Sequence, residues 1–392
     1  MHIQRFDAIV IGAGIVGATL AASLAQQGHH IAIVEPYPSQ AFDPNSAFEL
    51  RVSAISRASQ RALAQVGAWD KVLAKRAHAY DVMQVWDATG QGEIRFAAAE
   101  LGEADLGHIV ENQVTQLSLM EVLQAEPNAQ LFCPASMTHL TLMPEGLRQV
   151  QLDTGVCLQA PLVVGADGAN SMVRDLAGVS VERCDYGQKG LVAVVKTEHG
   201  HQDTAWQRFL PTGPLAFLPL DQGYSSIVWS LPSDQADRYL KQSEEVFQQS
   251  LASALDYRLG AIMEVGPRAA FPLLGSQASS HIAKGVALVG DAAHTIHPLA
   301  GQGVNLGIKD AVVLAELLSR CPPKLWGSHK RLRQYERARK GDNLMTMKVM
   351  EGFKLLFGHD AEVVKLARNT GLNVFNAMPV VKQQIMRNAM GL

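Results

Sequence analysis

The chain has 392 residues, which is enough for two domains or one elaborated domain. Its 47% hydrophobic and 18% charged residues indicate a globular protein, and a formal net charge of −3 argues against nucleic-acid binding. The four cysteines form no CxxC pair, which argues against a zinc site or a disulfide framework, and no apolar run reaches the roughly 18 residues of a membrane-spanning helix.

The stretch from residue 7 to residue 35 has the order strand, glycine turn, helix, strand and acid. Gly12 permits the tight turn, Gly14 lets a pyrophosphate approach the backbone, and Gly17 lets the helix pack close to the strands. The helix N-terminus supplies free N–H groups and a positive dipole end for phosphate. Glu35 follows Gly14 by about twenty residues, the usual distance for an acid that accepts hydrogen bonds from an adenosine ribose. A dinucleotide site is therefore predicted.

The glycine motif by itself leaves two questions open. It does not distinguish FAD from NAD, although the carboxylate of Glu35 disfavours NADP because a 2′-phosphate would face it. A βαβ unit that binds nothing is the other interpretation, because glycines also mark ordinary turns. The matching strands and helix on both sides of the motif favour the nucleotide site.

The rest of the chain alternates between helical and strand patterns. In chain order we expect an exposed loop at 36–49, a helix at 57–66, a β-hairpin at 83–96, and a helix to about residue 125 with Asn112 as its N-cap. Antiparallel strands follow at 131–157, a buried strand at 162–165, a strand-rich segment at 191–229 and a helix at 243–257. Another buried strand is expected at 286–289, and the pattern from Gly303 onward is helical, with breaks near residues 322 and 379.

Two further motifs follow the buried strands. Residues 165–171 read GADGANS, and residues 290–305 read GDAAHTIHPLAGQGVN. Together with the glycine motif, they resemble the aromatic-hydroxylase group of FAD-dependent monooxygenases. The resemblance implies FAD as the cofactor. The positions that it implies for FAD contact are Gly12, Gly14, Gly17, Glu35, Arg51, Asn112, Asp167, Asp291, Gly303, Val304 and Asn305.

The order of these pieces predicts a discontinuous domain. We expect an α/β fold with a Rossmann-like FAD-binding domain of the aromatic-hydroxylase type, an inserted antiparallel β-sheet substrate domain and C-terminal helices. The FAD-binding domain is assigned to residues 1–75, 108–180 and 281–392, and the β-rich domain to residues 76–107 and 181–280. A small-molecule site is expected in the cleft between them.

A closer resemblance is to the ubiquinone-biosynthesis hydroxylases, and it is carried by residues 51–56, 110–112, 204–209, 213–220 and 291–307. It implies hydroxylation of the ring of a polyprenylated quinol through a flavin C4a-hydroperoxide, with O₂ and NAD(P)H or another electron donor. Sister enzymes that act at another ring position are an alternative, and so is a flavin-dependent isoprenoid reductase or dehydrogenase. The intact motifs argue against a third alternative, a non-enzymatic assembly subunit.

Several of these residues also have simpler interpretations. Gly303 would form an ordinary turn, Arg51 a surface ion pair and Asp167 a helix cap. In the functional interpretation, Gly303, Val304 and Asn305 begin a helix whose N–H groups stabilise the negative charge of a reduced flavin.

Two sets of side chains raise further alternatives. Asp291, His294 and His297 have the ligand types of a non-haem iron site. Because the acid lies in a strand-end turn beside the flavin motifs, we expect no metal and assign the histidines to bracing that loop. Three aromatic residues either line a ring pocket or belong to the core of the sheet, and no catalytic acid or base is assigned. They are Trp206, Phe209 and Phe217.

The C-terminal region from Lys340 places methionine, leucine and phenylalanine among lysines. This pattern fits a helix that faces a membrane or a partner, and it equally fits a helix packed on the FAD-binding domain. The predicted location is the cytoplasm with peripheral contact at the inner membrane. The polyprenyl quinol, O₂ and the electron donor are the expected small-molecule partners, and a ubiquinone-biosynthesis complex and a homo-oligomer are further possibilities.

Overall fold

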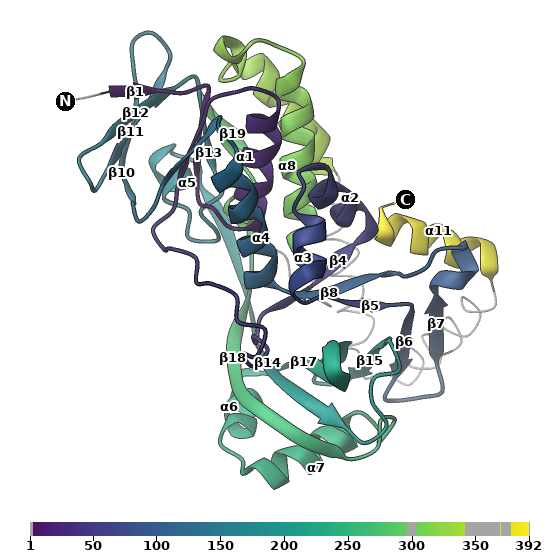
Figure 1. Cartoon of the computed structure of the whole chain (residues 1–392). Coiled ribbons are helices and arrows are strands. Elements are labelled where there is room, and N and C mark those ends of the chain that lie inside the picture. The colour runs from purple at the N-terminus through teal and green to yellow at the C-terminus, as the bar shows by residue number, and fades with distance from the viewer. Residues whose placement is uncertain (1–2, 296–302, 342–368, 370–377, 392) are drawn as a thin grey trace.

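The computed structural model describes residues 3–295, 303–341, 369 and 378–391, which form four sheets (Figure 1). The central sheet has six strands. In spatial order they are β19 (Ile282–Ala283), β20 (Val286–Leu288), β13 (Leu162–Gly165), β2 (Ala8–Ile11), β3 (Ile31–Val34) and β9 (Ala129–Phe132). Neighbouring strands pair in parallel, except that β19 and β20 pair antiparallel.

Alternate residues of the central strands belong to two different hydrophobic cores. In β2, Ala8 and Val10 join a cluster that contains the helices, whereas Ile9 and Ile11 join a cluster shared with a second sheet. A continuous apolar run is what a parallel strand needs when both of its faces are buried. The helices of the first cluster are α1 (Ile15–Gln26), α2 (Arg57–Gln65), α3 (Trp69–Lys75), α4 (Asn112–Ala125) and α8 (Gly303–Ser319).

The second sheet covers the other face of the central sheet. Its four strands are β1 (Ile3–Arg5), β12 (Cys157–Ala160), β11 (Arg148–Leu152) and β10 (Met137–Leu142), in spatial order. The short helix α5 (Met172–Leu176) contributes Val173 to the same core. The central sheet is thus enclosed between a helical layer and a β layer.

The third sheet has eight strands and lies in the lower half of Figure 1. In spatial order they are β21 (His294–Thr295), β18 (Ile262–Ala278), β14 (Val181–Thr197), β17 (Tyr224–Pro232), β16 (Gly213–Pro219), β15 (Thr204–Leu210), β6 (Val82–Asp87) and β7 (Glu93–Ala97). One face packs on α6 (Ser233–Leu240) and α7 (Glu244–Ala254). The opposite face packs on the fourth sheet, which consists of β4 (Val52–Ser56), β8 (Gly107–Glu111) and β5 (His78–Tyr80).

Shorter elements and a helical stretch at residues 329–341 complete the described residues. The shorter elements are the 3₁₀ turns η1 (Ala98–Leu101), η2 (Asp221–Gly223), η3 (Gly290–Ala292) and η5 (Pro323–Leu325), and the C-terminal helix α11 (Pro379–Met390). Among the described residues, no helix combines the length and the apolar character needed to cross a bilayer.

The predicted fold class is confirmed, because three segments far apart in the sequence, at 8–34, 162–165 and 286–288, join one sheet. The expected hairpin is formed by β6 and β7, which pair antiparallel. The prediction of antiparallel strands from residue 131 is wrong at its start. The strand β9 pairs in parallel with β3, because it ends the segment that crosses back through α4. The domain boundaries drawn from the sequence stay predictions.

Helix α8 packs on α1 where Gly307 meets Val16. A β carbon at Gly307 would lie 2.5 Å from Val16 Cγ2 and 3.2 Å from Gly290 Cα. Alanine normally stabilises a helix interior by about 1 kcal/mol relative to glycine, but here overpacking costs about 1–3 kcal/mol. We therefore expect Gly307→Ala to lower the free energy of unfolding, measured by denaturant titration.

The control is Gly341→Ala, because a β carbon at that exposed helical position meets no atom within 4 Å. It should leave stability unchanged or raise it. Equal stabilisation by both substitutions would contradict the close contact between α8 and α1.

Candidate functional site

Four neighbouring strands of the central sheet bring the predicted motifs to one edge. The order β20, β13, β2 and β3 is parallel throughout, and Gly165 is in register with both Ile11 and Leu288. Their carboxyl ends are therefore adjacent, and each leads directly into one of the predicted site segments. The segments are the turn from Gly12, the turn with Asp167, the turn with Asp291, and Glu35. The carboxyl edge of a parallel sheet is where such folds bind nucleotides.

The glycine turn has the close contacts that its three glycines require. Gly12 has φ +101°, and a β carbon there would collide with the carbonyl oxygen of Ala166 in the neighbouring turn. A β carbon at Gly17 would collide with the carbonyl oxygen of Gly12. By contrast, a β carbon at Gly14 would meet no atom within 4 Å. The backbone at Gly14 is therefore open to approach from outside, as a pyrophosphate needs.

Helix α1 begins directly after this turn. Gly14 is its N-cap, no side chain caps the helix, and no acidic residue stands in its first turn. The positive end of the helix dipole is thus not neutralised by the protein, which suits a phosphate. Together with the open face of Gly14, this N-terminus fits the pyrophosphate of FAD.

The carboxylate of Glu35 is buried and fastens the glycine turn to β3. Its Oε2 accepts a hydrogen bond from the N–H of Ala13 at 2.7 Å, and its Oε1 accepts one from the N–H of Tyr37 at 3.1 Å. A carboxylate has about four acceptor sites, so two further bonds are available to ribose hydroxyls. Glu35 therefore has a structural role that the sequence did not predict, and it keeps the capacity for the predicted one.

Asp167 is half-buried at the turn after β13. Its Oδ1 accepts a hydrogen bond from Ser171 Oγ at 2.5 Å, and its Oδ2 accepts one from the N–H of Val173 at 3.1 Å. Burial raises the pKa of Asp167, and these two bonds oppose that rise. The carboxylate thus binds an N–H group in the first turn of α5, although the N-cap residue of this helix is Ser171.

Asp291 projects from the turn after β20 in a different environment. Its side chain is accessible to solvent, yet the surrounding protein raises its pKa by desolvation, while the charges of His294 and Arg51 oppose that rise. The charge of Arg51 thus acts on Asp291, although the two residues are distant in the sequence.

A buried network centred on Asp310 of α8 holds the turn that carries Asp291. Asp310 Oδ2 accepts hydrogen bonds from the N–H of Gly290 at 3.0 Å and from His294 Nε2 at 2.7 Å, and its Oδ1 accepts one from Arg339 Nε at 2.6 Å. Asp310 and Arg339 are both fully buried. Burial alone would raise the pKa of Asp310, but His294 and Arg339 lower it below its ordinary value.

Sequence reasoning missed Asp310 and Arg339. The available signal was an acid on the apolar stripe of a predicted helix, three residues after Gly307 and four before Leu314, where a charge needs a buried partner. The prediction that His294 braces the flavin loop is confirmed by its bond to Asp310. His297 lies outside the described residues.

The N-terminal end of α8 is tied to strand β4 by Asn305. Its side-chain oxygen accepts a hydrogen bond from the N–H of Ser56 at 3.0 Å, and its amide nitrogen donates to the carbonyl of Ala54 at 2.7 Å. The side chain is thus used to hold β4, and the predicted contact with a flavin is left to the backbone N–H groups at the start of α8. Gly303 and Val304 precede Asn305 on this first turn, and both are partly accessible.

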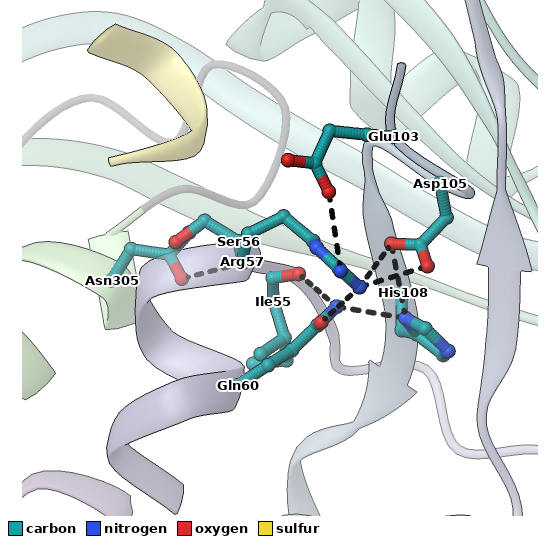
Figure 2. A network of polar contacts seen from close by, with 8 residues as sticks. All are labelled: Ile55, Ser56, Arg57, Gln60, Glu103, Asp105, His108 and Asn305. Atoms are coloured by element: carbon teal, nitrogen blue, oxygen red, sulfur yellow. Dashed lines mark hydrogen bonds and ion pairs between the residues drawn. The ribbon is translucent and has the colours of Figure 1, made fainter. Parts of the chain in front are cut away.

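Figure 2 shows that the contacts continue from Ser56 to a charged cluster around Arg57. Arg57 donates hydrogen bonds to Asp105 at 3.0 Å and to Glu103 at 3.3 Å, so the start of α2 is fixed to the segment that precedes β8. On β8 itself, His108 Nδ1 lies 2.8 Å from Gln60 Nε2. This network was not predicted, because its members are separated by about fifty residues.

The predicted N-cap role of Asn112 is wrong. The N-cap of α4 is Glu111, and Asn112 is the first helical residue. The side-chain oxygen of Asn112 instead accepts a hydrogen bond from Ser53 Oγ at 2.7 Å, because β4 and β8 are paired at this point. Asn112 therefore bonds to the hydroxyl of Ser53 on the adjacent strand instead of capping a backbone N–H group of α4.

An apolar pocket lies between the three-stranded and eight-stranded sheets. Its walls come from β4, β5, β6, β8, β15 and β16, and Tyr80 and Gln207 contribute polar side chains among apolar ones such as Met83, Ile109 and Leu218. Burial, with a smaller effect of the Asp105 charge, raises the pKa of Tyr80 to about 12. With this pKa, as with the ordinary value of 10, the phenol is protonated at neutral pH, so its hydroxyl can donate a hydrogen bond.

The three predicted aromatic residues lie differently around this pocket. Phe217 is fully buried in the cluster on the α6 and α7 side, as the core interpretation predicted. Trp206 touches the pocket, but its ring packs at 6.2 Å from that of Trp86, and its indole N–H donates to the carbonyl of His201. Phe209 is half-buried, and strand alternation places it on the same face as Gln207.

A separate polar cluster has the spacing of a metal site. Ligand atoms of His78, His201 and Asp203 lie within 4.8 Å of one another. Each ring nitrogen has a protein partner, however. His78 contacts Asp221 and Asp203 at 2.9 Å, and His201 contacts the carbonyl of Leu220 at 2.9 Å and the N–H of Asp203 at 3.1 Å. Hydrogen bonds within the protein account for this geometry, and the bond to Asp221 raises the pKa of His78.

The chain is similar to known FAD-binding proteins. A family model described as "FAD binding domain" matches residues 5–347. The chain is 37% identical to 3-demethoxyubiquinol 3-hydroxylase of Escherichia coli (strain K12), with 99% of each chain covered. It is 36% identical to ubiquinone hydroxylase UbiL of Rhodospirillum rubrum, with 98% of this chain and 89% of UbiL covered. The solved structure of p-nitrophenol 4-monooxygenase PnpA from Pseudomonas putida DLL-E4 has the same fold, with a TM-score of 0.78, 18% identity, and 100% and 99% of the two chains covered.

The charge of Asp310 is expected to be essential for the Asp291 turn. Asp310→Asn deprives the buried Arg339 of this carboxylate, so we expect the free energy of unfolding to fall by about 3–5 kcal/mol. FAD retention after gel filtration should fall in the surviving folded fraction, because Gly290 and His294 lose their anchor. Glu316→Gln, an exposed substitution on the same helix, is the control. Retention of FAD and stability by both variants would contradict the anchoring role.

His281 makes stability depend on pH. Burial, with a smaller effect of His294, lowers the pKa of His281 from an ordinary 6.5 to about 4. Below pH 6.5 the unfolded chain binds a proton that the folded chain does not, so stability falls as the pH drops from 6.5 to 4. A pKa difference of this size corresponds to about 3 kcal/mol.

Denaturant titrations at several pH values should show a weaker pH dependence for His281→Gln than for the unmodified protein. The exposed His139→Gln variant is the control and should keep the full dependence. An unchanged slope in His281→Gln would contradict the assignment.

Proposed function

The chain belongs to the ubiquinone-biosynthesis hydroxylase family of FAD-dependent monooxygenases, and from this premise we propose that it hydroxylates the ring of a polyprenylated quinol. The proposed substrate is 2-polyprenyl-3-methyl-6-methoxy-1,4-benzoquinol. Similarity to a 3-demethoxyubiquinol 3-hydroxylase over 99% of both chains supports this choice. A sister ring position and an isoprenoid reductase are less favoured, because the relatives matched over nearly the full length are ring hydroxylases.

The observation that carries the proposal is the convergence of four strand ends. The open backbone of Gly14, the uncapped start of α1 and the accessible carboxylate of Asp291 meet at one sheet edge. Each of these features suits a different part of one dinucleotide. A glycine turn that bound no ligand would not require an uncapped helix start or an accessible carboxylate beside it.

We assign the parts of FAD to this edge as follows. The turn of Gly12, Gly14 and Gly17 would hold the pyrophosphate, and Glu35 the adenosine ribose. Asp291, with Arg51 near it, would bind the ribityl and pyrophosphate side. The N–H groups of Gly303, Val304 and Asn305 would face the negative edge of the reduced flavin, while Asn112 and Asp167 would lie along the cofactor through segments that their side chains already fix.

When bound, FAD supplies the reductive activation of O₂, and the chain supplies orientation and exclusion of water. The pocket between the sheets is the proposed ring site, because its walls are mostly apolar. The phenol of Tyr80, which keeps its proton at neutral pH, would donate a hydrogen bond to a quinol oxygen. Gln207 would provide a second polar contact on the opposite sheet. NAD(P)H or another reductant would serve as the electron donor.

Turnover of the purified protein tests the proposal. With FAD, NAD(P)H or a chemical reductant, and the methylated, methoxylated quinol, we expect O₂ uptake to match formation of a hydroxylated ring. Mass spectrometry should find the new oxygen labelled when labelled O₂ is used. Saturation of an isoprenoid double bond without O₂ uptake would assign a reductase instead. Hydroxylation of an earlier phenol, but not of this quinol, would assign a sister enzyme.

A further inference from the structure

Helix α11 has a distinctive composition and position. Its sequence PVVKQQIMRNAM contains two basic residues, Lys382 and Arg387, and no acidic residue. Figure 1 shows it at the margin of the molecule, close to the end of α2 and above β5 and β7. A short basic helix at this place has one face toward the protein and one away from it.

The inner face of α11 is fixed by specific contacts. Lys382 is buried, and its Nζ lies 2.8 Å from Glu100 Oε1. Met386 and Met390 form a buried cluster with Ala98 and Leu106. An ion pair and packing therefore determine how the helix is rotated about its own axis. The same contacts determine which side chains lie on its outer face.

The outer face of α11 presents large apolar side chains to solvent. The exposed fractions are 80% for Val380, 41% for Val381 and 46% for Ile385, and Met378 just before the helix is 46% exposed. Met378, Val381 and Ile385 are spaced by three and four residues, so they form one stripe along the helix. Beside this stripe the helix exposes the basic side chain of Arg387, whereas Lys382 is buried against Glu100. An exposed apolar stripe next to a cation is a feature of segments that lie in a membrane interface.

The inner face of α11 is continuous with the pocket. Tyr80 and Met83 line the pocket and also pack against the cluster that contains Met386 and Met390. One continuous apolar region thus includes the pocket, these two side chains and the inner face of α11. The outer face of the same helix carries the exposed stripe.

We propose that α11 is a membrane-contact helix. Its stripe of Met378, Val381 and Ile385 enters the interface of an anionic bilayer, and the pocket wall formed by Tyr80 and Met83 then lies on the side of the molecule that faces the lipid. The choice of a bilayer over a protein partner follows from the exposed Arg387, on a helix that contains no acid, and from the continuity with the pocket. The inference rests on the proposed function, since a polyprenyl quinol is dissolved in the bilayer. The tail would remain near the membrane while the ring occupies the pocket.

Vesicle binding tests the proposal with the full-length FAD-loaded protein. Vesicles of phosphatidylethanolamine and phosphatidylglycerol are sedimented with the unmodified protein and with the double variant Val381→Gln/Ile385→Gln. We expect the double variant to bind roughly tenfold more weakly, because two interfacial apolar side chains are lost. A double variant at exposed apolar positions elsewhere, Val246→Gln/Met263→Gln, is the matched control and should bind normally.

Activity separates the membrane contact from the catalytic proposal. With a short-tailed, water-soluble quinol, all three proteins should turn over equally, whereas a long-tailed quinol in vesicles should be hydroxylated roughly tenfold more slowly by the α11 variant alone. Equal vesicle binding by the α11 variant and the unmodified protein would overturn the inference. So would a change in oligomeric state without a change in vesicle binding, because the stripe would then face a second copy. If no protein hydroxylates either quinol, the proposed function fails, while the sedimentation result still decides the membrane contact.

Discussion

The structure of the site depends on one buried carboxylate. Asp310 accepts hydrogen bonds from a backbone N–H of the turn at Gly290, from His294 and from Arg339, all inside the core. A buried charge is strongly destabilising unless it is paired and hydrogen-bonded, and these three partners supply the hydrogen bonds and the opposite charge. The same bonds that satisfy Asp310 fix the turn from which Asp291 projects. Stability and the geometry of the cofactor edge thus have a common origin.

The central parallel sheet explains how distant segments produce one site. Parallel register aligns the ends of β20, β13, β2 and β3, so their turns are neighbours whatever their distance in the chain. The antiparallel sheet inserted between these strands then places a pocket against the three-stranded sheet. The two regions differ physically, because the strand ends present backbone turns, whereas the pocket presents mostly apolar side chains.

The sequence predicted what depends on local backbone chemistry. Gly12, Gly14 and Gly17 were recognisable because their spacing reflects a turn that only glycine can form, and the acid at position 35 followed from the length of a βαβ unit. The pairing of Asp310 with Arg339 was not predictable, because the two residues come from different segments of the chain. Asn112 was misjudged for a related reason, since Ser53 on the adjacent strand provides a partner that no local pattern reveals.

The long strand β18 has a mechanical consequence. Its 17 residues pair with β14 along most of their length, and near its end Ser276 and Gln277 pair with Thr295 and His294. This ladder, which contains several register shifts, connects the eight-stranded sheet to the segment that begins three residues after Asp291. The same sheet supplies β6, β15 and β16 to the walls of the pocket. A substitution that moved this sheet would therefore alter both the pocket and the segment that follows Asp291.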